Sequence, residues 1–427
     1  MKKVAILGLG ISGRAVANYL LKQGIEFIGV DRSPEKREDF DVISQDAPID
    51  LEGVELVVKS PGVALSHPWV SAASQKNIPI MGEIDLALKE LQGKGKTIVA
   101  ITGTNGKTTT TLFLTHLLNK TGRRASAVGN IGTPLISQIE DNSDFFVIEL
   151  SSYQLETIVF RPVFDAALIL NITPNHLERH RTLEAYAQTK LQLQYCIKKN
   201  CPFFVQQMVL NQYGNFFESQ NRLIVFDNYK KKVETILSLV YMDKRSEFHF
   251  HDLENFSAAY ALLQYFNLPE VVMREGLETF KKPPHRIEFV RKLNGVTYID
   301  DSKATNLEAV KKAVGSISGE IVLIAGGIAQ GGSFREWIPL FTGKVVCVLA
   351  TGQAAKAIYH EIGGTIKVQV LGSLRDCVQK AYRLAKADQT VLLSPGCSSF
   401  DQFKDYQHRG EEFKKWVLAI EEKRNES

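Results

Sequence analysis

The sequence predicts an α/β protein of three domains: Rossmann-like domains at both ends and a central P-loop domain with a mostly parallel sheet. At roughly 100–200 residues per domain, a chain of 427 residues is too long for one core. Short apolar runs rich in β-branched residues alternate with helical patterns, as in parallel sheets. Turns rich in glycine or proline follow many of these runs. A polar Gly-Lys linker and a pair of prolines place the domains at 1–92, 93–283 and 284–427.

Composition excludes several classes of protein. Hydrophobic residues make up 44%, charged residues 23%, and the net charge is +4, so no nucleic-acid or membrane partner is expected. No apolar run approaches the roughly 20 residues of a membrane helix, and the one after Met1 is too short for a signal peptide. The five cysteines are scattered without a CxxC pair, which suits a reducing cytosol. We expect a soluble, cytoplasmic protein.

The first 31 residues have the pattern of a dinucleotide-binding unit. An apolar strand, Val4–Leu7, leads into Gly8-Leu-Gly-Ile-Ser-Gly13 and a helix, and a second strand, Glu26–Val30, ends at Asp31. Such a turn holds a pyrophosphate at a helix N-terminus, and the acid reaches a ribose. The ligand is then either a nicotinamide cofactor or another diphosphate, such as that of a UDP-sugar.

The rest of this domain continues the alternation. The strand Leu56–Lys59 runs into Ser60-Pro61-Gly62, which is either a ligand-binding turn at a strand end or a plain turn. The remaining predicted elements are the helices His67–Gln75 and Ile84–Leu91 and the strand Ile78–Ile80.

The central domain opens with a phosphate-binding pattern. The strand Thr97–Ile101 breaks into a loop with Gly103 and Gly106, and Lys107 and Thr108 open a helix. Glycines let backbone N–H groups converge, lysine adds charge, and the hydroxyl can ligate Mg²⁺. The spacing departs from Gly-x4-Gly-Lys-[Ser/Thr], which would need glycine at Ile101. The alternative is a strand-to-helix turn with an accidental lysine; we interpret the stretch as an ATP site.

Two further residues sit where a magnesium site needs them. Glu149 closes the apolar strand Phe145–Ile148, where a carboxylate is either an Mg²⁺ ligand or a solvated strand end. His176 follows the strand Ala166–Leu170 and is otherwise a core or surface histidine. Other predicted elements here are the strand Ala125–Val128 and the helices Leu183–Tyr195, Asp252–Phe266 and Pro269–Phe280. No chemistry is assigned to residues 200–250.

The last third again alternates strands and helices. Asp301 and Lys303 lie just past a strand, and their types suit holding a ribose or orienting a substrate acid. The predicted strands are Ile287–Val290, Val296–Ile299, Glu320–Ile324, Val345–Leu349 and Thr390–Leu393.

Taken together, these features favour ATP-driven joining of two molecules. The sequence lacks a Gly-x-Ser-x-Gly elbow and an HExxH zinc helix, whereas phosphate-binding turns recur. The chemistry would be phosphorylation of a carboxylate to an acyl phosphate, followed by attack of an amine.

Eight motifs together resemble those of the Mur ligase family. They are Gly8–Gly13, Ser60–Gly62, Thr102–Thr108, Gly129–Gly132, Glu149–Glu156, His285-Arg286, Asp301–Asn306 and Leu392–Ser399. The resemblance is strongest to the members that add D-glutamate to UDP-N-acetylmuramoyl-L-alanine in peptidoglycan synthesis. It implies ATP, these two substrates, two Mg²⁺ ions and a monomeric enzyme.

The resemblance also implies residue roles. The catalytic residues would be Lys107, His176, Lys190 and Lys303. The metal ligands would be Thr108, Glu149, His176 and Lys190, with Lys190 carbamylated. ATP would contact Gly103, Thr104, Asn105, Gly106, Lys107, Thr108, Thr109, Asn255, Arg286 and Asp301. The UDP-substrate would contact Gly10, Ile11, Ser12, Asp31, Arg32, Ser60, Pro61, Gly62, Asn130, Ser151 and His176. D-glutamate would contact Lys303, Thr305, Gln330, Ser399 and Tyr406.

Three departures from the family pattern stand out. Family members carry lysine or arginine after the Gly-Gly turn, where this chain has Gln330, so a neutral amide replaces a charge-assisted contact. The adenine-binding stretch keeps only Asn255 of its two asparagines. The end of the second strand reads Asp31-Arg32-Ser33.

Three other functions compete with this interpretation. A ligase for another acceptor, such as a folylpolyglutamate synthetase, would lack the N-terminal UDP-binding unit. An NAD(P)-dependent oxidoreductase would use Gly8–Gly13 but leave the P-loop idle. A non-catalytic nucleotide-binding module would have the same fold but would not catalyse the ligation.

Overall fold

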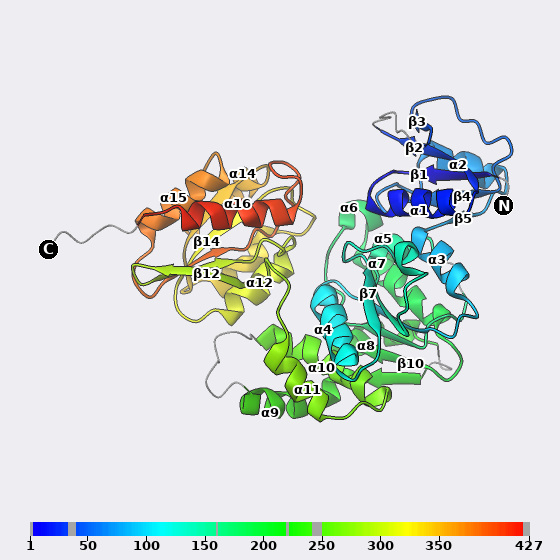
Figure 1. Cartoon of the computed structure of the whole chain (residues 1–427). Helices are drawn as coiled ribbons and strands as arrows, with labels where there is room; N and C mark the ends of the chain where they lie inside the picture. Colours follow the sequence, from blue (N-terminus) through cyan, green and yellow to red (C-terminus); the bar gives the residue numbers. More distant parts are fainter. Residues whose placement is uncertain (1–2, 33–39, 159–160, 219–221, 241–249, 422–427) are drawn as a thin grey trace. The chain divides into compact units, whose positions relative to one another are not determined.

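The computed structural model describes residues 3–32, 40–158, 161–218, 222–240 and 250–421 (Figure 1). Its strands form three sheets of five, six and six strands. The chain divides into two compact units. One comprises Met1–Ile172, Ala187–Asp243 and Leu253–Phe280 and contains the first two sheets; the other comprises Thr173–Tyr186, Lys244–Asp252 and Lys281–Ser427 and contains the third.

The first sheet is parallel, in the order β3-β2-β1-β4-β5. The chain moves outward from β1 in both directions, so the carboxyl ends of β1 and β4 form the switch point where such sheets bind ligands. Helices α1 and α2 cover opposite faces (Figure 1), and Trp69, Val70 and Ala73 of α2 pack against apolar strand residues. The elements are β1 (Lys3–Leu7), α1 (Ile11–Lys22), β2 (Glu26–Asp31), β3 (Val42–Ser44), β4 (Leu56–Lys59), α2 (Pro68–Gln75), β5 (Ile80–Met81) and α3 (Glu83–Leu91).

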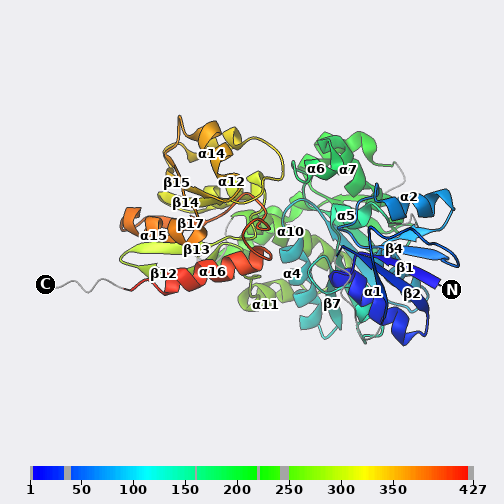
Figure 2. The same cartoon turned by 90° about the horizontal axis from the view of Figure 1, so that it is seen from above.

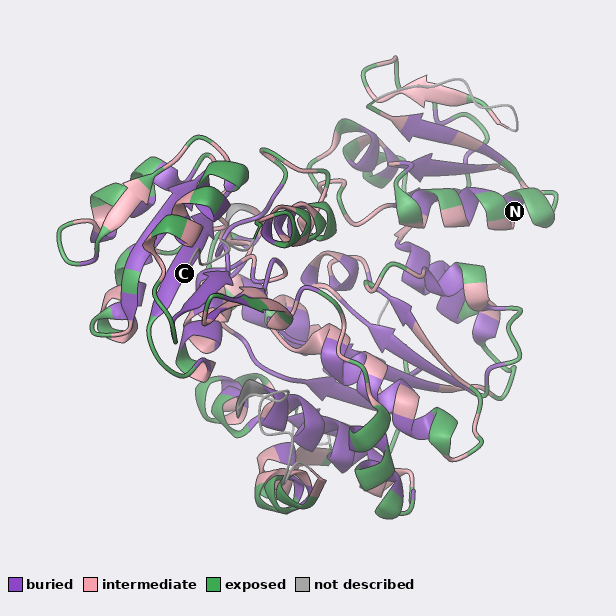
Figure 3. Ribbon diagram, turned by 60° about the vertical axis from the view of Figure 1, so that its left-hand side comes forward, coloured by how far each residue is buried: buried purple, intermediate pink, exposed green. Residues whose placement is uncertain are grey.

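The second sheet is also parallel, in the order β11-β10-β9-β6-β8-β7. Strand β6 lies between β9 and β8, and Ile101 of β6 pairs with Glu149 of β8, so both strands end at the same level. The strands at the centre are buried on both faces (Figure 3). The elements are β6 (Thr97–Thr102), α4 (Lys107–Lys120), β7 (Ala125–Gly129), η1 (Leu135–Gln138), β8 (Phe145–Glu149), α5 (Ser152–Leu155), β9 (Ala166–Ile169), α7 (Leu183–Leu191), η2 (Gln192–Cys196), β10 (Pro202–Val205), α8 (Gln207–Tyr213), η3 (Gly214–Phe216), β11 (Arg222–Val225), η4 (Phe226–Tyr229), α9 (Lys230–Val240), α10 (Phe250–Tyr265) and α11 (Val271–Thr279).

The third sheet has the order β12-β13-β17-β14-β15-β16, with β12 antiparallel to β13 and the other pairs parallel. Helices α12 and α14 cover one face and α15 and α16 the other (Figure 2). The elements of this unit are α6 (Leu177–His180), β12 (Glu288–Leu293), β13 (Val296–Asp300), α12 (Leu307–Ser316), β14 (Ile321–Gly326), η5 (Phe334–Trp337), α13 (Ile338–Phe341), β15 (Val345–Thr351), α14 (Ala355–Ile362), β16 (Val368–Val370), α15 (Leu374–Leu384), β17 (Thr390–Leu393) and α16 (Tyr406–Leu418).

The structure confirms the predicted α/β class and three-sheet organisation and corrects several element bounds. The helix predicted over Leu183–Tyr195 is α-helical only to Leu191 and continues as a 3₁₀ turn. The strand predicted at Ile78–Ile80 is Ile80–Met81, and the one predicted at Ile287–Val290 is Glu288–Leu293. The short strands β3 and β16 lie at sheet edges, where half-burial leaves little apolar signal in the sequence.

Among the described helices, none combines the length and the apolar character that crossing a membrane requires.

Candidate functional site

A cavity of about 480 Å³ lies at the switch point of the first sheet. It is bounded by the β1–α1 turn, the end of β2, the loop after β4 and the start of α2. It brings together eight residues singled out from the sequence: Gly10, Ile11, Ser12, Asp31, Arg32, Ser60, Pro61 and Gly62. Residues from three separate segments therefore form one ligand-sized pocket.

Local contacts hold the glycine turn in shape. Gly8 has a φ of +82°, and its carbonyl accepts a 2.7 Å hydrogen bond from Ser60 Oγ. Asp31 Oδ2 accepts a 2.6 Å bond from the backbone N–H of Leu9. A Cβ at Gly13 would overlap the Gly8 carbonyl, so only glycine lets α1 begin this close to the strand. No side chain caps the first turn of α1. Its backbone N–H groups can therefore donate to the oxygens of a diphosphate.

The sequence analysis gave no role to two polar side chains of this cavity, Gln45 and His67. Gln45 follows the short edge strand β3, and His67 is the N-cap of α2. The position of His67 before Pro68 was a usable helix-start signal, but nothing in the sequence placed Gln45 beside it.

The second site is the loop between β6 and α4. Gly103 and Gly106 have φ angles of +145° and +87°, which favour glycine. Lys107 Nζ donates to the carbonyls of Gly103 and Thr104, at 2.9 Å each. Helix α4 opens with Lys107, Thr108 and Thr109 and has no side-chain N-cap. The loop therefore places glycines, an ammonium and a helix N-terminus together, as a phosphate requires.

Asn171 braces this loop, and sequence reasoning gave it no role. Its Oδ1 accepts from the N–H of Asn105 at 2.8 Å, and its backbone carbonyl accepts from the N–H of Thr104 at 2.8 Å. Its Nδ2 donates to the Asn105 carbonyl and to Glu254 Oε1. Asn255, from the same helix as Glu254, lies against Gly106 and accepts from Thr110 Oγ1 at 3.4 Å. The start of α10 thus approaches the loop.

Glu149 has the environment of a metal ligand. It is 2% exposed; Oε1 accepts a 2.8 Å bond from Asn130 Nδ2, whereas Oε2 is buried without a hydrogen-bond partner among the described residues. Leaving a buried carboxylate oxygen unpaired costs free energy, which a cation would recover. The residues present therefore fit an Mg²⁺ ion.

Lys190 is 1% exposed and close to the same loop. Its Nζ donates to the Gly103 carbonyl at 3.0 Å and to Thr102 Oγ1 at 3.4 Å. Burial, and secondarily the Lys107 ammonium, lower the pKa of Lys190 well below its usual value, while Glu149 opposes the shift. The amine is thus biased toward its neutral, nucleophilic form.

Two residues predicted to contact the UDP-substrate have local structural roles as well. Ser151 caps α5 by accepting from the N–H of Gln154, in a capping box. His176 belongs to the second compact unit and is the N-cap of α6, with a φ of +54°. Its expected place beside Glu149 and Lys190 stays a prediction.

The second unit gathers its predicted residues around the end of β13. Asp301 is buried; Oδ2 accepts from Ser394 Oγ at 2.8 Å and Oδ1 from the N–H of Ile287 at 3.3 Å. Burial, together with the negative charge of Asp300, raises the pKa of Asp301 to about 7. The hydrogen bond from Ser394 and the positive charge of Arg286 oppose this shift.

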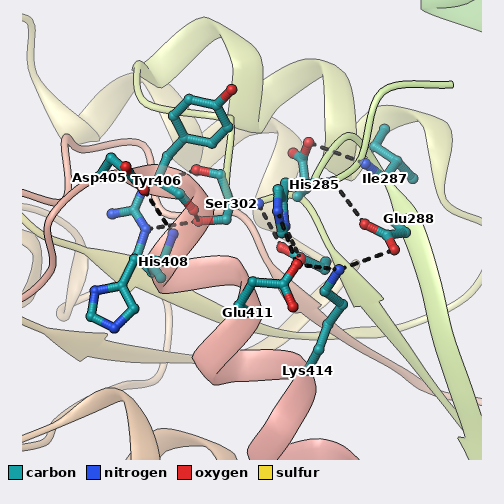
Figure 4. Close-up of polar contacts among 12 residues, drawn as sticks. His285, Ile287, Glu288, Ser302, Asp405, Tyr406, His408, Glu411 and Lys414 are labelled. Atoms are coloured by element: carbon teal, nitrogen blue, oxygen red, sulfur yellow. Dashed lines mark hydrogen bonds and ion pairs between the residues drawn. The ribbon is translucent and has the colours of Figure 1, made fainter. Parts of the chain in front are cut away.

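Lys303 and Tyr406 meet in this unit. Lys303 Nζ lies 3.7 Å from the centre of the Tyr406 ring, a cation–π contact. Ser302 Oγ donates to the Tyr406 carbonyl at 2.8 Å (Figure 4). Thr305 is half-buried and Ser399 is 2% exposed. Gln330 has its Oε1 buried without a hydrogen-bond partner within the described chain.

In the same unit, His285, Glu288 and Asp300 form a cluster of residues whose side chains could ligate a metal ion. His285 Nδ1 lies 2.6 Å from Asp300 Oδ2. Lys414 Nζ lies 3.3 Å from Glu288 Oε1 (Figure 4). The Lys414 ammonium also lies 2.8 Å from Glu411 Oε1. Because the cluster contains its own cation, we assign no metal to it.

The fold and these sites define a class: a three-domain α/β protein with a diphosphate-type turn, a P-loop and a third, Rossmann-like domain. More particularly, the chain belongs to the Mur ligase family. Three family models match: the Mur ligase MurD-like N-terminal domain over residues 2–82, the Mur ligase middle domain over 101–270, and the Mur ligase glutamate ligase domain over 285–397.

Curated relatives match over nearly the whole chain. A UDP-N-acetylmuramoylalanine–D-glutamate ligase of Protochlamydia amoebophila is 42% identical, with 98% of each chain covered. The ligase of the same name from Chlamydia pneumoniae is 36% identical, covering 98% of this chain and 99% of that one.

Solved structures share the fold. The MurF ligase of Thermotoga maritima in complex with ADP aligns with a TM-score of 0.61 at 16% identity, covering 98% of this chain and 95% of that one. The UDP-N-acetylmuramate–alanine ligase of the same organism aligns with a TM-score of 0.60 at 15% identity, covering 98% and 100%.

Proposed function

We propose that this chain is an ATP-dependent ligase that joins D-glutamate to UDP-N-acetylmuramoyl-L-alanine in peptidoglycan precursor synthesis. The observation that carries the proposal is the similarity to ligases of that name at 42% and 36% identity over 98% of the chain. The geometry agrees, since the chain combines a diphosphate-type cavity with a phosphate loop that an oxidoreductase would not need.

The central loop would hold ATP. Lys107, Thr108 and the loop residues Gly103–Gly106 would contact its phosphates, and Asn255, Arg286 and Asp301 would contact the rest of the nucleotide. Thr108, Glu149, His176 and Lys190 would hold two Mg²⁺ ions. Bound Mg²⁺ would neutralise the negative charge of the phosphates.

Lys190 would serve as a carbamate. Its neutral amine nitrogen would attack the carbon of CO₂, a C–N bond would form as one C=O π bond opens onto oxygen, and one proton would leave to solvent, so a neutral amine would become an anionic oxygen ligand. The lowered pKa supports this step because only the neutral amine is a nucleophile.

The reaction then proceeds in two steps. The alanine carboxylate of the UDP-substrate attacks the γ-phosphorus of ATP, giving an acyl phosphate and ADP. The amine of D-glutamate attacks the acyl carbon, phosphate leaves, the amine loses a proton, and an amide bond remains. The N-terminal cavity, Asn130, Ser151 and His176 would hold the UDP-substrate; Lys303, Thr305, Gln330, Ser399 and Tyr406 would hold D-glutamate.

One assay tests the proposal. Purified protein with Mg²⁺, ATP, UDP-N-acetylmuramoyl-L-alanine and D-glutamate should release phosphate and form the amide product, and omitting any one substrate should abolish phosphate release. Phosphate release that depends on another amino acid would overturn the assignment of D-glutamate as the substrate but would leave the assignment as an ATP-dependent ligase intact. No release with any amino acid, together with NADH binding, would favour the oxidoreductase alternative. We expect the active species to be a monomer, which sedimentation velocity checks.

A further inference from the structure

We propose that Gln45 and His67 select uracil over cytosine in the N-terminal cavity; this inference rests on the proposed function, because it takes the ligand to be a nucleoside diphosphate. Both side chains line the cavity. They were not among the residues that the family resemblance assigned.

The position of Gln45 follows from the order of the strands. The glycine turn follows β1, Asp31 ends β2, and Gln45 follows β3, so three neighbouring strand ends line up along one edge of the sheet. In such a fold the diphosphate lies at the first turn and the ribose at the acid that ends the second strand. The base then extends toward β3 and meets Gln45.

The backbone of Gln45 is held on both sides. Its N–H donates to the Asp31 carbonyl at 2.9 Å, and its carbonyl accepts from the indole Nε1–H of Trp69 at 3.2 Å. Trp69 is fully buried in the core of this domain. The side chain of Gln45 therefore projects from a fixed point.

The helix cap determines which tautomer His67 adopts. His67 is the N-cap of α2, and its Nδ1 accepts from the backbone N–H of Trp69 at 3.4 Å. A nitrogen that accepts a hydrogen bond carries no proton, so the ring proton sits on Nε2. Burial and Arg32 lower the pKa of His67, which favours the neutral ring, with Asp46 opposing.

The tautomer in turn orients the amide of Gln45. His67 Nε2 lies 3.5 Å from Gln45 Oε1, so the Nε2–H is the donor and the amide oxygen the acceptor. The flipped amide would bring its NH₂ group against another donor, which is unfavourable. Gln45 therefore offers an NH₂ donor and the second lone pair of Oε1.

This arrangement matches one pyrimidine. Uracil presents carbonyl acceptors beside its N3–H donor, so a glutamine amide can pair with it through two hydrogen bonds. Cytosine presents an unprotonated N3 beside an amino donor, and pairing with it requires the flipped amide. A two-bond match of this kind discriminates between bases by about 5- to 150-fold.

The test measures UDP and CDP binding to the full chain by calorimetry, since the two nucleotides share the diphosphate. The unaltered protein should bind UDP at least about fivefold more tightly than CDP. Gln45→Leu should weaken UDP binding and bring the two affinities together. His67→Asn keeps a capping oxygen for Trp69 but is too short to reach Gln45, so CDP binding should strengthen while UDP binding changes little.

Glu52→Gln, on the exposed loop before β4, is the matched control and should leave both affinities unchanged. Gain of CDP binding by His67→Asn is a result that damage to the fold cannot produce. Equal binding of UDP and CDP by the unaltered protein, or an unchanged ratio in Gln45→Leu, would overturn the inference while leaving the ligase assay untouched. Failure to bind UDP at all would overturn it too, and the ligase assay would decide separately whether the proposed function falls.

Discussion

At the scale of single residues, the candidate sites depend on polar side chains buried where strands end. Glu149, Lys190 and Asp301 are each less than a tenth exposed. Burial is unfavourable for all three as charged groups, so each requires a compensating partner. The structure supplies some partners, such as Asn130 for Glu149, and leaves one oxygen of Glu149 without a hydrogen-bond partner within the described residues. That pattern is typical of a site completed by a bound ion.

Lys190 gives the first prediction. Lys190→Ala should reduce phosphate release by more than about 100-fold, because the active site loses a metal ligand. A short carboxylic acid added to the variant should restore part of the rate by replacing the carbamate. Lys198→Ala, at a partly exposed ion pair with Asp165, is the control and should keep full activity. Unchanged turnover in Lys190→Ala would remove Lys190 from the site.

Gln330 gives the second prediction. Gln330→Lys restores the positive charge of the family pattern, so the KM for D-glutamate should fall by roughly tenfold with little change in kcat. The KM for ATP should not change. Gln379→Lys adds the same charge on the exposed face of α15 and should have no effect. A KM for D-glutamate that stays constant or rises in Gln330→Lys would show that Gln330 does not face the amino acid.

At the scale of secondary-structure elements, the sites form where a helix begins directly after a buried strand. Helices α1 and α4 both follow glycine turns and lack side-chain N-caps, so their first backbone N–H groups remain available for phosphate oxygens. Some positions in these turns require glycine: a Cβ at Gly13 would overlap the Gly8 carbonyl, and Gly103 and Gly106 have positive φ angles.

Gly106 and Gly122 flank α4 and form a matched pair for the third prediction. Both have positive φ angles, +87° and +78°, so alanine at either should destabilise the fold by about 1 kcal/mol. A Cβ at Gly106 would also overlap Asn255 Oδ1, whereas one at Gly122 meets open space. Gly106→Ala should therefore weaken ATP binding by roughly tenfold or more, and Gly122→Ala should not. Calorimetric titration with ATP and thermal denaturation check both; equal ATP affinities would contradict the steric argument.

The fourth prediction concerns Glu83, in the first turn of α3. It is 3% exposed; Oε1 accepts from the N–H of Ile136 in η1 at 2.7 Å, and Oε2 has no hydrogen-bond partner in the described part of the chain. Burial raises the pKa of Glu83 from 4.5 to about 7, against the opposing hydrogen bonds from Ile136 and Leu135. The folded state binds the Glu83 proton more tightly than the unfolded state does. The contribution of this proton to the free energy of unfolding is therefore fully present below pH 4.5 and is lost as the pH rises through 7.

Glu83→Gln removes this titration. The free energy of unfolding of the variant minus that of the unaltered protein should therefore be larger at pH 8 than at pH 5, by up to about 3 kcal/mol. Denaturant unfolding at both pH values measures the difference. The exposed Glu52→Gln should show no such pH dependence, and a Glu83→Gln curve parallel to that of the unaltered protein would refute the assignment.

At the scale of the whole molecule, the candidate sites are divided between the two compact units. The N-terminal cavity and the loop between β6 and α4 belong to the first unit, whereas Lys303, Gln330 and Tyr406 belong to the second. A ligand that binds only the folded form of one unit stabilises that unit by mass action, by about 2.7 kcal/mol at a hundredfold excess over its Kd.

This gives the fifth prediction, read through tryptophan fluorescence. Trp69 is buried in the first unit and Trp337 in the second. In a chain carrying Trp337→Phe and Trp416→Phe, UDP should raise the unfolding midpoint reported by Trp69. In a chain carrying Trp69→Phe and Trp416→Phe, UDP should leave the midpoint reported by Trp337 unchanged. Equal shifts would show instead that the two units unfold as one.

The sequence alone determined the class of fold, the positions of the central strands and most of the candidate residues. Buried parallel strands are short, apolar and rich in β-branched residues, and phosphate-binding turns need glycine and lysine at fixed spacing, so both leave a local signal. The domain limits at residues 92 and 283 and the roles assigned to site residues stay predictions.

Only the tertiary structure decided which distant residues meet. Asn171 braces the loop between β6 and α4, Glu149 Oε2 is buried without a hydrogen-bond partner among the described residues, and Gln45 lies against His67 in the N-terminal cavity. Each of these contacts joins segments more than 20 residues apart or depends on burial. A hydrogen-bonding side chain has no periodic pattern of its own, so its partner is known only once the sheet has brought the strand ends together.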